Sequence, residues 1–335
     1  MAYLVLSNGT VFSGTRFGAA CDSIGELVFT TGMEGYIETL TDESYAGQIV
    51  TQTFPLIGNY GMIEEDFEGK SAVRGYIVRE ICDTPSNFRC DETVDSFLKK
   101  HNIPGLYGID TRALTRMLRE EGTMNAVICD TVPETLDALK AYSVQNAVSS
   151  VSCTKPLEYF PDGEIKHRVT LIDYGAKRNI IRCLVKRGCH VTVVPYNTSA
   201  EDILAQNSDG IMLSNGPGDP TENVGCIKEL QKLLGKKPIF GICLGHQLTA
   251  LAMGGKTYKL KYGHRGANQP VKEVVGTRTY ITSQNHGYAV DAESLGNHAR
   301  ISYINANDGS CEGVDYPGLS CFTVQFHPEA CSGPK

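Results

Sequence analysis

Short apolar runs separated by turn residues mark the opening of the chain. Alternating positions between Tyr3 and Phe12 predict a β-hairpin. Its centre, Asn8-Gly9, offers two residues that tolerate positive φ, as a two-residue type I′ turn requires. The first half is therefore expected to be rich in β-strands.

A helical period interrupts this pattern at residues 108–122. Asp110 can cap the first turn, Leu114, Met117 and Leu118 fall on one face, and Gly122 can end the helix. We predict one amphipathic helix here, so the first domain combines strands with helices in an α+β arrangement.

Apolar runs and helical stretches alternate in the second half. The expected strands are 169–173, 191–194, 210–214 and 238–242, and the expected helices are 177–188 and 221–235. This alternation predicts an α/β, doubly wound and mostly parallel sheet, which binds ligands at the carboxyl ends of its strands. From residue 257 onward, Tyr, Val and short turns predict added antiparallel strands.

A polar, aperiodic stretch separates the two patterns. It contains Ser149-Ser150, Pro156 and the Pro161-Asp-Gly163 turn. We therefore expect an N-terminal domain at 1–150, a linker at 151–167 and a second domain at 168–335.

Composition narrows the classes of function. The 335 residues include 31 Lys and Arg against 38 Asp and Glu, a net charge of −7, and no basic stripe that would suggest nucleic acid binding. The 12 cysteines lack metal-ligand spacing, so no metal site is expected. No signal peptide or membrane-spanning run stands out, which suits free thiols in a reducing cytoplasm.

The run Gly241-Ile-Cys243-Leu-Gly245 joins an expected strand to an expected helix. Such a strand-turn-helix elbow needs glycine on both sides of an exposed nucleophile. The helix N-terminus would favour a thiolate over a thiol. Cys243 is the candidate nucleophile.

A thiolate nucleophile needs a nearby base and a group that orients the base. His327-Pro328-Glu329 offers both, because residues two apart on an extended chain project to the same side. The alternative is that His327 only ends a strand at a proline turn. The elbow around Cys243 favours the catalytic interpretation.

Two polar loops are weaker candidates. Asn215-Gly216-Pro-Gly218-Asp-Pro220 follows an expected strand, so its backbone N–H groups can face a developing negative charge, although an ordinary turn would look similar. The segment 284–288 is a polar loop that could bind substrate amide or carboxylate groups.

Two further features are expected to lie outside the chemistry. His246, three residues beyond Cys243 on the same helix, is interpreted as a packed or locally hydrogen-bonded residue. The basic run Lys261-Tyr-Gly-His264-Arg265 is interpreted as a short solvated loop.

Together, the Cys243 elbow, His327-Pro-Glu329 and the 215–220 loop resemble class I glutamine amidotransferases of the triad type. A narrower resemblance, to the small-subunit family of carbamoyl phosphate synthetase, extends over nearly the whole chain. Its motifs lie at Gly25–Phe29, Gly35–Tyr45, Ile57–Gly61, Gly108–Arg112, Gly175–Asn179 and Gly263–Pro270.

The resemblance implies Cys243 as nucleophile, His327 as base and Glu329 as the carboxylate that orients it. It also implies glutamine contacts from one residue of the first domain and several of the second: Ser44, Gly216, Gly218, Leu244, Gln247, Asn285, Gly287 and Tyr288. Backbone N–H groups near Gly216 and Leu244 are expected to hold the oxyanion.

The implied activity is glutamine hydrolysis, with ammonia passed to a large synthetase subunit that makes carbamoyl phosphate for arginine and pyrimidine biosynthesis. No cofactor is expected on this chain, and ATP and Mg are expected on the large subunit. Residues 1–150 would dock that partner. We expect family members to continue beyond Lys335.

Two alternatives remain open at this point. The chain could feed ammonia to another acceptor synthase, although the β-rich first domain then has no evident role. It could also be a non-catalytic regulatory subunit that binds glutamine, against which the intact Cys, His and Glu argue.

Overall fold

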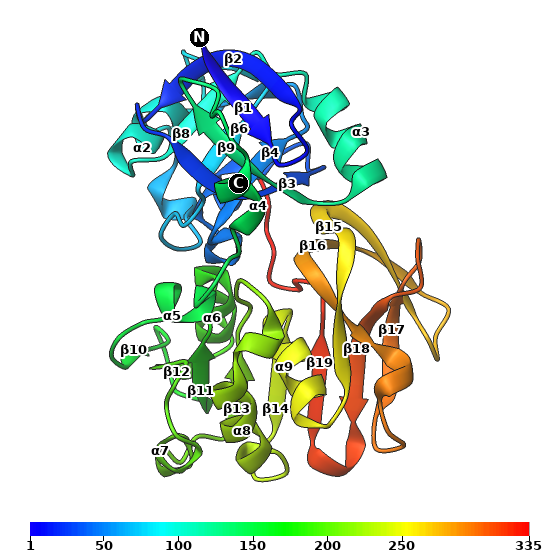
Figure 1. The fold of residues 1–335 in the computed structure, drawn as a ribbon. Helices are drawn as coiled ribbons and strands as arrows, with labels where there is room; N and C mark the ends of the chain where they lie inside the picture. The colour runs from blue at the N-terminus through cyan, green and yellow to red at the C-terminus, as the bar shows by residue number, and fades with distance from the viewer. Residues whose placement is uncertain (335) are drawn as a thin grey trace. The chain divides into compact units, whose positions relative to one another are not determined.

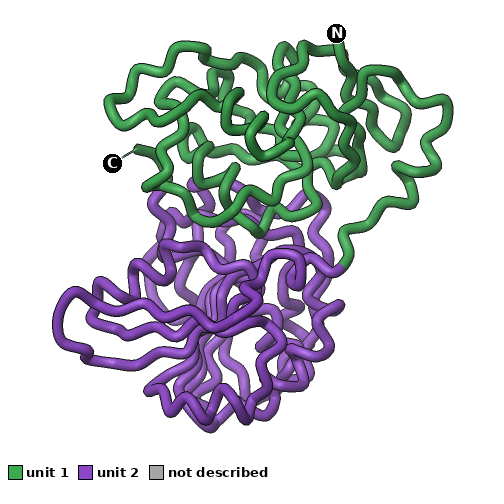
Figure 2. The backbone as a smooth tube through the Cα atoms, turned by 90° about the vertical axis from the view of Figure 1, so that its left-hand side faces the viewer, with its two compact units in different colours: residues 1–145, 332–335 green, residues 146–331 purple. Residues whose placement is uncertain are grey.

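The computed structural model describes residues 1–334, which form two compact units (Figure 2). Unit 1 holds residues 1–145 and the segment that begins at Ser332, and unit 2 holds residues 146–331. Each unit is described separately below.

Unit 1 is built around a closed barrel of seven strands, in the order β1-β2-β8-β6-β4-β3-β9 (Figure 1). The strands of this unit are β1 Ala2–Leu6, β2 Val11–Gly18, β3 Ser23–Thr30, β4 Gln48–Gln52, β5 Leu56–Ile57, β6 Gly75–Ile77, β7 Glu80–Ile81, β8 Pro104–Tyr107 and β9 Met124–Cys129. Its α-helices are α1 Tyr36–Thr41, α2 Val94–Lys100, α3 Thr111–Glu121 and α4 Asp137–Ala141. The expected β-rich α+β character is confirmed.

The first hairpin forms, but the expected type I′ turn is wrong. Leu6 pairs with Thr10 around three loop residues, and within this loop only Gly9 has positive φ, at 92°. The Asn8 side chain accepts a hydrogen bond from the Thr10 N–H at 2.9 Å. A three-residue loop that ends in a left-handed glycine is the next most common way to connect two hairpin strands.

Helix α3 agrees with its sequence pattern. The Asp110 carboxylate accepts a hydrogen bond from the Ala113 N–H at 2.9 Å, and Gly122 ends the helix with φ of 102°. Leu114 and Leu118 are fully buried. The cap, the apolar face and the terminating glycine each behave as local sequence predicts.

Unit 2 contains a sheet of ten strands in the order β10-β12-β11-β13-β14-β19-β18-β16-β15-β17. Its strands are β10 Leu157–Tyr159, β11 His167–Asp173, β12 Cys189–Pro195, β13 Gly210–Leu213, β14 Ile239–Ile242, β15 Lys256–Glu273, β16 Thr279–Asp291, β17 Arg300–Asn305, β18 Cys311–Tyr316 and β19 Cys321–Val324. Five neighbouring strands are parallel, in the order β12, β11, β13, β14 and β19. Strands β15 to β18 are antiparallel, as expected for the chain beyond residue 257, but the expectation is wrong for β19, which pairs in parallel with β14.

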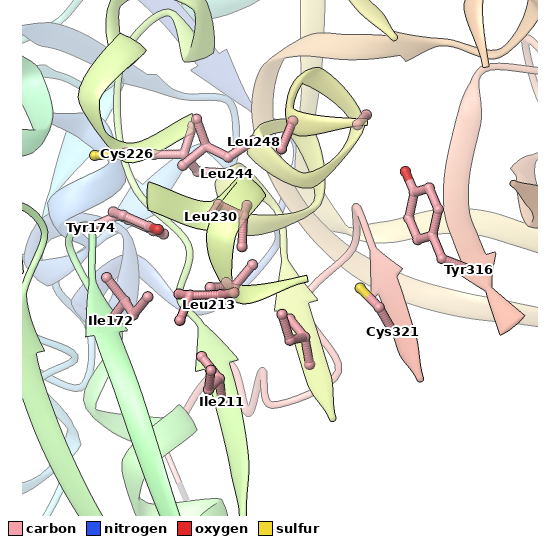
Figure 3. Packing of buried hydrophobic residues seen from close by; sticks show 14 of the residues in the cluster. Ile172, Tyr174, Ile211, Leu213, Cys226, Leu230, Leu244, Leu248, Tyr316 and Cys321 are labelled. Carbon is pink, nitrogen blue, oxygen red and sulfur yellow. The ribbon is translucent and has the colours of Figure 1, made fainter. Parts of the chain in front are cut away.

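Helices pack on both faces of this sheet. They are α5 Ala147–Val151, α6 Arg178–Lys186, α7 Ala200–Ala205, α8 Val224–Leu233 and α9 Leu244–Ala252. Figure 3 shows one core, where Leu213 of β13 packs with Leu230 of α8 and Leu248 of α9. Ile180 and Ile181 of α6 belong to a second core that contains other residues of the parallel strands. The expected doubly wound α/β fold is confirmed.

The stretch expected as a linker carries regular structure. Strand β10 pairs with β12 in antiparallel fashion, and Cys153 N–H donates a 2.7 Å hydrogen bond to the Asp173 carboxylate. These contacts add the stretch to unit 2. Among the described residues, no helix combines the length and apolar character needed to cross a lipid bilayer.

Candidate active site

Cys243 lies at the carboxyl end of β14 and caps the N-terminus of α9. Its backbone has φ of 52° and ψ of −102°, a conformation that L residues rarely adopt. The Cys243 N–H donates to the Val324 carbonyl at 2.8 Å, which ties the turn to β19. The thiol is thus held at the sheet edge by a strained turn, which is typical of a nucleophile elbow.

The two flanking glycines are required by close packing. A Cβ on Gly245 would lie 2.6 Å from Leu213 Cβ and 2.7 Å from the Leu213 carbonyl oxygen. A Cβ on Gly241 would lie 3.0 Å from the backbone of Gly245. The G-x-C-x-G spacing therefore reflects how tightly the elbow folds over β13.

His327 and Glu329 follow the neighbouring strand β19 and form a buried pair. Nδ1 of His327 lies 2.8 Å from a Glu329 carboxylate oxygen. Because a carboxylate only accepts, Nδ1 carries the proton and Nε2 is the atom left to exchange one. Within residues 1–334, His327 Nε2 has no hydrogen-bond partner. The structure thus joins the expected base to its expected orienting group.

The charges around His327 favour its protonated form. Burial and the Lys177 ammonium lower its pKa, but Glu329 and the nearby Cys243 thiol outweigh them and raise the pKa to about 9. Burial raises the pKa of Glu329, yet the His327 imidazolium lowers it below the ordinary value. The site is arranged as an imidazolium paired with a carboxylate.

Strand β16 contacts both the candidate nucleophile and the candidate base. The Cys243 thiol lies 3.7 Å from the Asn285 carbonyl oxygen, and the His327 N–H donates to the Ser283 carbonyl at 2.9 Å. The segment 284–288, interpreted from sequence as a loop, is therefore part of a strand. Asn285, Gly287 and Tyr288 lie on it. The polar composition misled because polar side chains of this segment, Gln284, Asn285 and His286, are buried on a strand.

The loop after β13 lies against the elbow. A Cβ on Gly216 would meet the Tyr174 carbonyl and would lie 2.7 Å from Leu244 Cδ2. Gly218 has φ of 85°, a left-handed conformation that favours glycine. The structure thus brings Gly216 and Leu244 together, the two positions whose N–H groups were expected to hold an oxyanion.

The two remaining glutamine-binding candidates lie in different units. Gln247, on α9, donates from its side chain to the Tyr288 carbonyl at 2.8 Å and to the Gln325 side chain at 3.0 Å. It therefore links the helix to β16. Ser44 lies in unit 1, on a single 3₁₀ turn at Glu43–Tyr45, where its N–H donates to Asp42.

Two site residues were seen in the sequence only as part of a family motif. Asn179 donates a side-chain hydrogen bond to the Glu329 carbonyl, and Lys177 supplies the positive charge already noted near His327. Both follow β11, whose carboxyl end adjoins that of β13. Their polar side chains just past the end of a parallel strand were the sequence signal that could have identified them as site residues.

His246 behaves as the sequence indicated. It is fully buried, its Nδ1 lies 2.8 Å from Thr323 Oγ1, and burial lowers its pKa to about 3. The interpretation of Lys261–Arg265 as a solvated loop is wrong. This run belongs to β15, and Arg265 is only 4% exposed.

Comparison with known proteins matches both units. The family model described as "Carbamoyl-phosphate synthase small chain, CPSase domain" matches residues 4–128, and "Glutamine amidotransferase class-I" matches residues 170–335.

Individual relatives match over the whole chain. The carbamoyl phosphate synthase small chain of Clostridium perfringens is 52% identical over 338 residues, covering 100% of this chain and 95% of that protein. The protein of the same name from Bacillus anthracis is 52% identical, covering 99% and 92%. A solved glutamine amidotransferase from Thermotoga maritima is 19% identical, covering 48% of this chain and 76% of its own, with a TM-score of 0.39.

Full-length identity above half and two family models, one in each half of the chain, show where the chain belongs. It is a member of the carbamoyl phosphate synthase small-chain family, the glutamine-hydrolysing subunit of carbamoyl phosphate synthetase.

Proposed function

We propose that this chain hydrolyses glutamine through a covalent thioester on Cys243. At rest the proton is on His327, as an imidazolium, and Cys243 acts as a thiolate that attacks the carbon of the glutamine side-chain amide. The C–N bond then breaks, and the His327 imidazolium gives its proton to the leaving nitrogen, which departs as ammonia. A glutamyl thioester remains on the sulfur.

Water completes the cycle. His327 removes a proton from water as it attacks the thioester carbonyl, the C–S bond breaks, and glutamate leaves while the thiolate is regenerated. Glu329 keeps Nδ1 protonated throughout, so Nε2 always performs the transfers. The N–H groups of Gly216 and Leu244 stabilise the oxyanion in both steps.

Glutamine itself is proposed to contact side chains and backbone around this thiol. The proposed contacts are Ser44, Gly216, Gly218, Leu244, Gln247, Asn285, Gly287 and Tyr288. The carbonyl that faces Cys243 is that of Asn285, and Gly287 lies two residues further along the same strand, which supports a substrate site along β16. Ser44→Ala should raise KM for glutamine.

The partner follows from the family, because a small chain implies a large synthetase chain. We propose that this large chain takes up the ammonia and binds the ATP and Mg used to form carbamoyl phosphate, that residues 1–150 dock it, and that the product serves arginine and pyrimidine synthesis. The reducing cytoplasm expected from free thiols also remains a proposal. All twelve cysteines are free in the structure.

The observation that carries the proposal is the pairing of a strained cysteine elbow with a buried His327–Glu329 pair on adjoining strand ends. It is tested in the assembled synthetase. Cys243→Ser should abolish carbamoyl phosphate formation from glutamine while formation from added ammonia continues. Retained use of glutamine by that variant would contradict the mechanism. A matched Cys226→Ser variant, at a buried cysteine of the core, should use both nitrogen sources.

A further inference from the structure

A second buried polar cluster lies in the antiparallel part of unit 2, on the strands beyond β19. His264 on β15 and His286 on β16 are direct cross-strand partners. Glu312 comes from β18, and Asp308 comes from the turn between β17 and β18. The mechanism above uses none of these side chains.

His264 is held between two carboxylates. Its Nε2 lies 3.0 Å from Asp308 Oδ2, and its Nδ1 lies 3.6 Å from Glu312 Oε1. Asp308 is itself fixed, since its other oxygen accepts from Ser310 N–H at 3.0 Å and from Ser310 Oγ at 2.8 Å. Glu312 is fully buried and accepts from the Asn305 amide at 3.2 Å. A charged imidazole satisfies this arrangement best.

The pKa values agree with that assignment. Burial lowers the pKa of His264, but the hydrogen bond to Asp308 and the nearby Glu312 outweigh it and raise the pKa to about 9, while burial raises the pKa of Glu312. Burial, followed by the nearby His264 charge, lowers the pKa of His286 well below its ordinary value. One histidine is therefore charged and its neighbour neutral at physiological pH.

The neutral ring has a defined tautomer. His286 Nδ1 lies 2.7 Å from the Tyr288 carbonyl oxygen, so Nδ1 is the donor. Its Nε2 lies 3.1 Å from the Gln284 side-chain amide, which must turn its NH2 group toward this acceptor nitrogen. The two histidine rings meet edge to face with centroids 5.0 Å apart. The charged and titratable groups around the two histidines come from several elements: Tyr258 and Arg265 on β15, Asp308, Glu312 on β18, and His327 after β19.

The position of His286 matters because of its neighbours on β16. The adjacent carbonyl, of Asn285, faces the Cys243 thiol, and the Ser283 carbonyl accepts from the His327 backbone. Tyr288, whose carbonyl holds His286, also accepts from Gln247. Any shift of this strand would displace the nucleophile and base relative to each other.

We propose that His264 is a positioning residue for glutamine hydrolysis: anchored by Asp308 and Glu312, its ring packs against His286 and holds residues 283–288 of β16 in register with Cys243 and His327. This role rests on the proposed function and adds a group that acts through β16 without touching the substrate.

The same cluster also has the residue types of a metal site. Ligand atoms of His264, His286 and Glu312 all lie within 4.8 Å of one another. A protonated imidazole has no lone pair to give a metal ion, however. In addition, the Asp308 carboxylate already bonds Nε2 of His264. The positioning role is therefore favoured, and metal dependence becomes an outcome of the test.

Asp308→Asn is the most informative variant. Asn keeps an oxygen for Ser310 but removes the carboxylate that raises the pKa of His264, so the ring should lose its charge as pH rises. We expect the ratio of the variant's kcat/KM for glutamine to that of wild type to fall about tenfold between about pH 6 and about pH 8, mostly because KM rises. This is the loss expected when one charge-assisted hydrogen bond is removed. His264→Gln should show a loss that does not vary with pH.

The assay uses the full chain assembled with its large chain, and the matched control is His167→Gln, an exposed histidine on β11. Wild-type turnover must first be present, which separates failure of the proposed function from failure of this role. Wild-type kinetics in both test variants would overturn the proposal. An Asp308→Asn loss that is equal at both pH values and accompanied by a lowered melting temperature would also overturn it, as would wild-type activity that requires zinc and disappears with a chelator.

Discussion

Cys243 owes its placement to its backbone. A non-glycine residue with φ of 52° and ψ of −102° carries strain of about 1–3 kcal/mol, which persists only where surrounding packing fixes it. Gly241 and Gly245 allow that packing because no side chain intervenes. Strain at this one residue is consistent with a nucleophile lifted above a sheet edge.

His327 gives a pH dependence whose sign can be worked out. Its pKa of about 9 means that the imidazolium needed to protonate the leaving amide nitrogen is lost as pH rises through that value. Glu329→Gln removes a charge that raises the pKa, so the alkaline limb of kcat/KM should move to lower pH by about one unit or more. A pH profile of glutamine hydrolysis measures this. An alkaline limb that stays in place would show that another group sets it.

At this scale, sequence could identify Cys243, His327 and Glu329 because local rules expose them. Glycine spacing marks the elbow, and a two-residue offset aligns a base with its carboxylate. His264 could not be identified, because its partners come from three other segments and because Lys261 and Arg265 made the run look solvated. Contacts between distant segments leave no local pattern.

Helix α1 shows how a single buried carboxyl can make an element sensitive to pH. Glu38 accepts a hydrogen bond from the Gly333 N–H at 2.9 Å, while its other oxygen is buried without a partner among residues 1–334. Burial raises the pKa of this carboxyl to about 7. The folded chain therefore binds this proton more tightly than the unfolded chain does.

This predicts the sign of a stability change. As pH rises from about 4.5 to about 7, the free energy of unfolding should fall, because the unfolded chain releases the proton first. Glu38→Gln removes that loss and should be more stable than wild type by about 3 kcal/mol above neutral pH, with little difference at about pH 4. Urea unfolding at both pH values measures this. Glu134→Gln, at an exposed site, is the control, and an equal effect of both substitutions would refute the explanation.

Most elements of the parallel sheet were predictable because they repeat a local rhythm, but helix α7 and the parallel pairing of β19 with β14 were not expected. Apolar strands and amphipathic helices alternate from β11 to α9, and the observed bounds differ from the expected ones by a few residues. The first turn was misjudged because Asn8 uses its side chain to cap the loop instead of adopting positive φ. Side-chain capping competes with turn type, and sequence alone does not show which prevails.

The arrangement of the whole molecule was only partly within reach of sequence. A doubly wound sheet follows from the order of its elements, but closure of the barrel in unit 1 depends on pairs such as β1 with β9 and β2 with β8. These pairs join distant segments. The return of the chain to unit 1 at Ser332 likewise has no local signal.

The central claim is that Cys243 is a glutamine-directed nucleophile, and covalent labelling tests it most directly. The full chain, alone and with its large chain, would be treated with 6-diazo-5-oxonorleucine and analysed by intact mass. We expect a single adduct on wild type and on Cys331→Ser, which changes an exposed cysteine, and no adduct on Cys243→Ser. Equal labelling of Cys243→Ser, or no labelling of wild type even with the large chain present, would contradict the account.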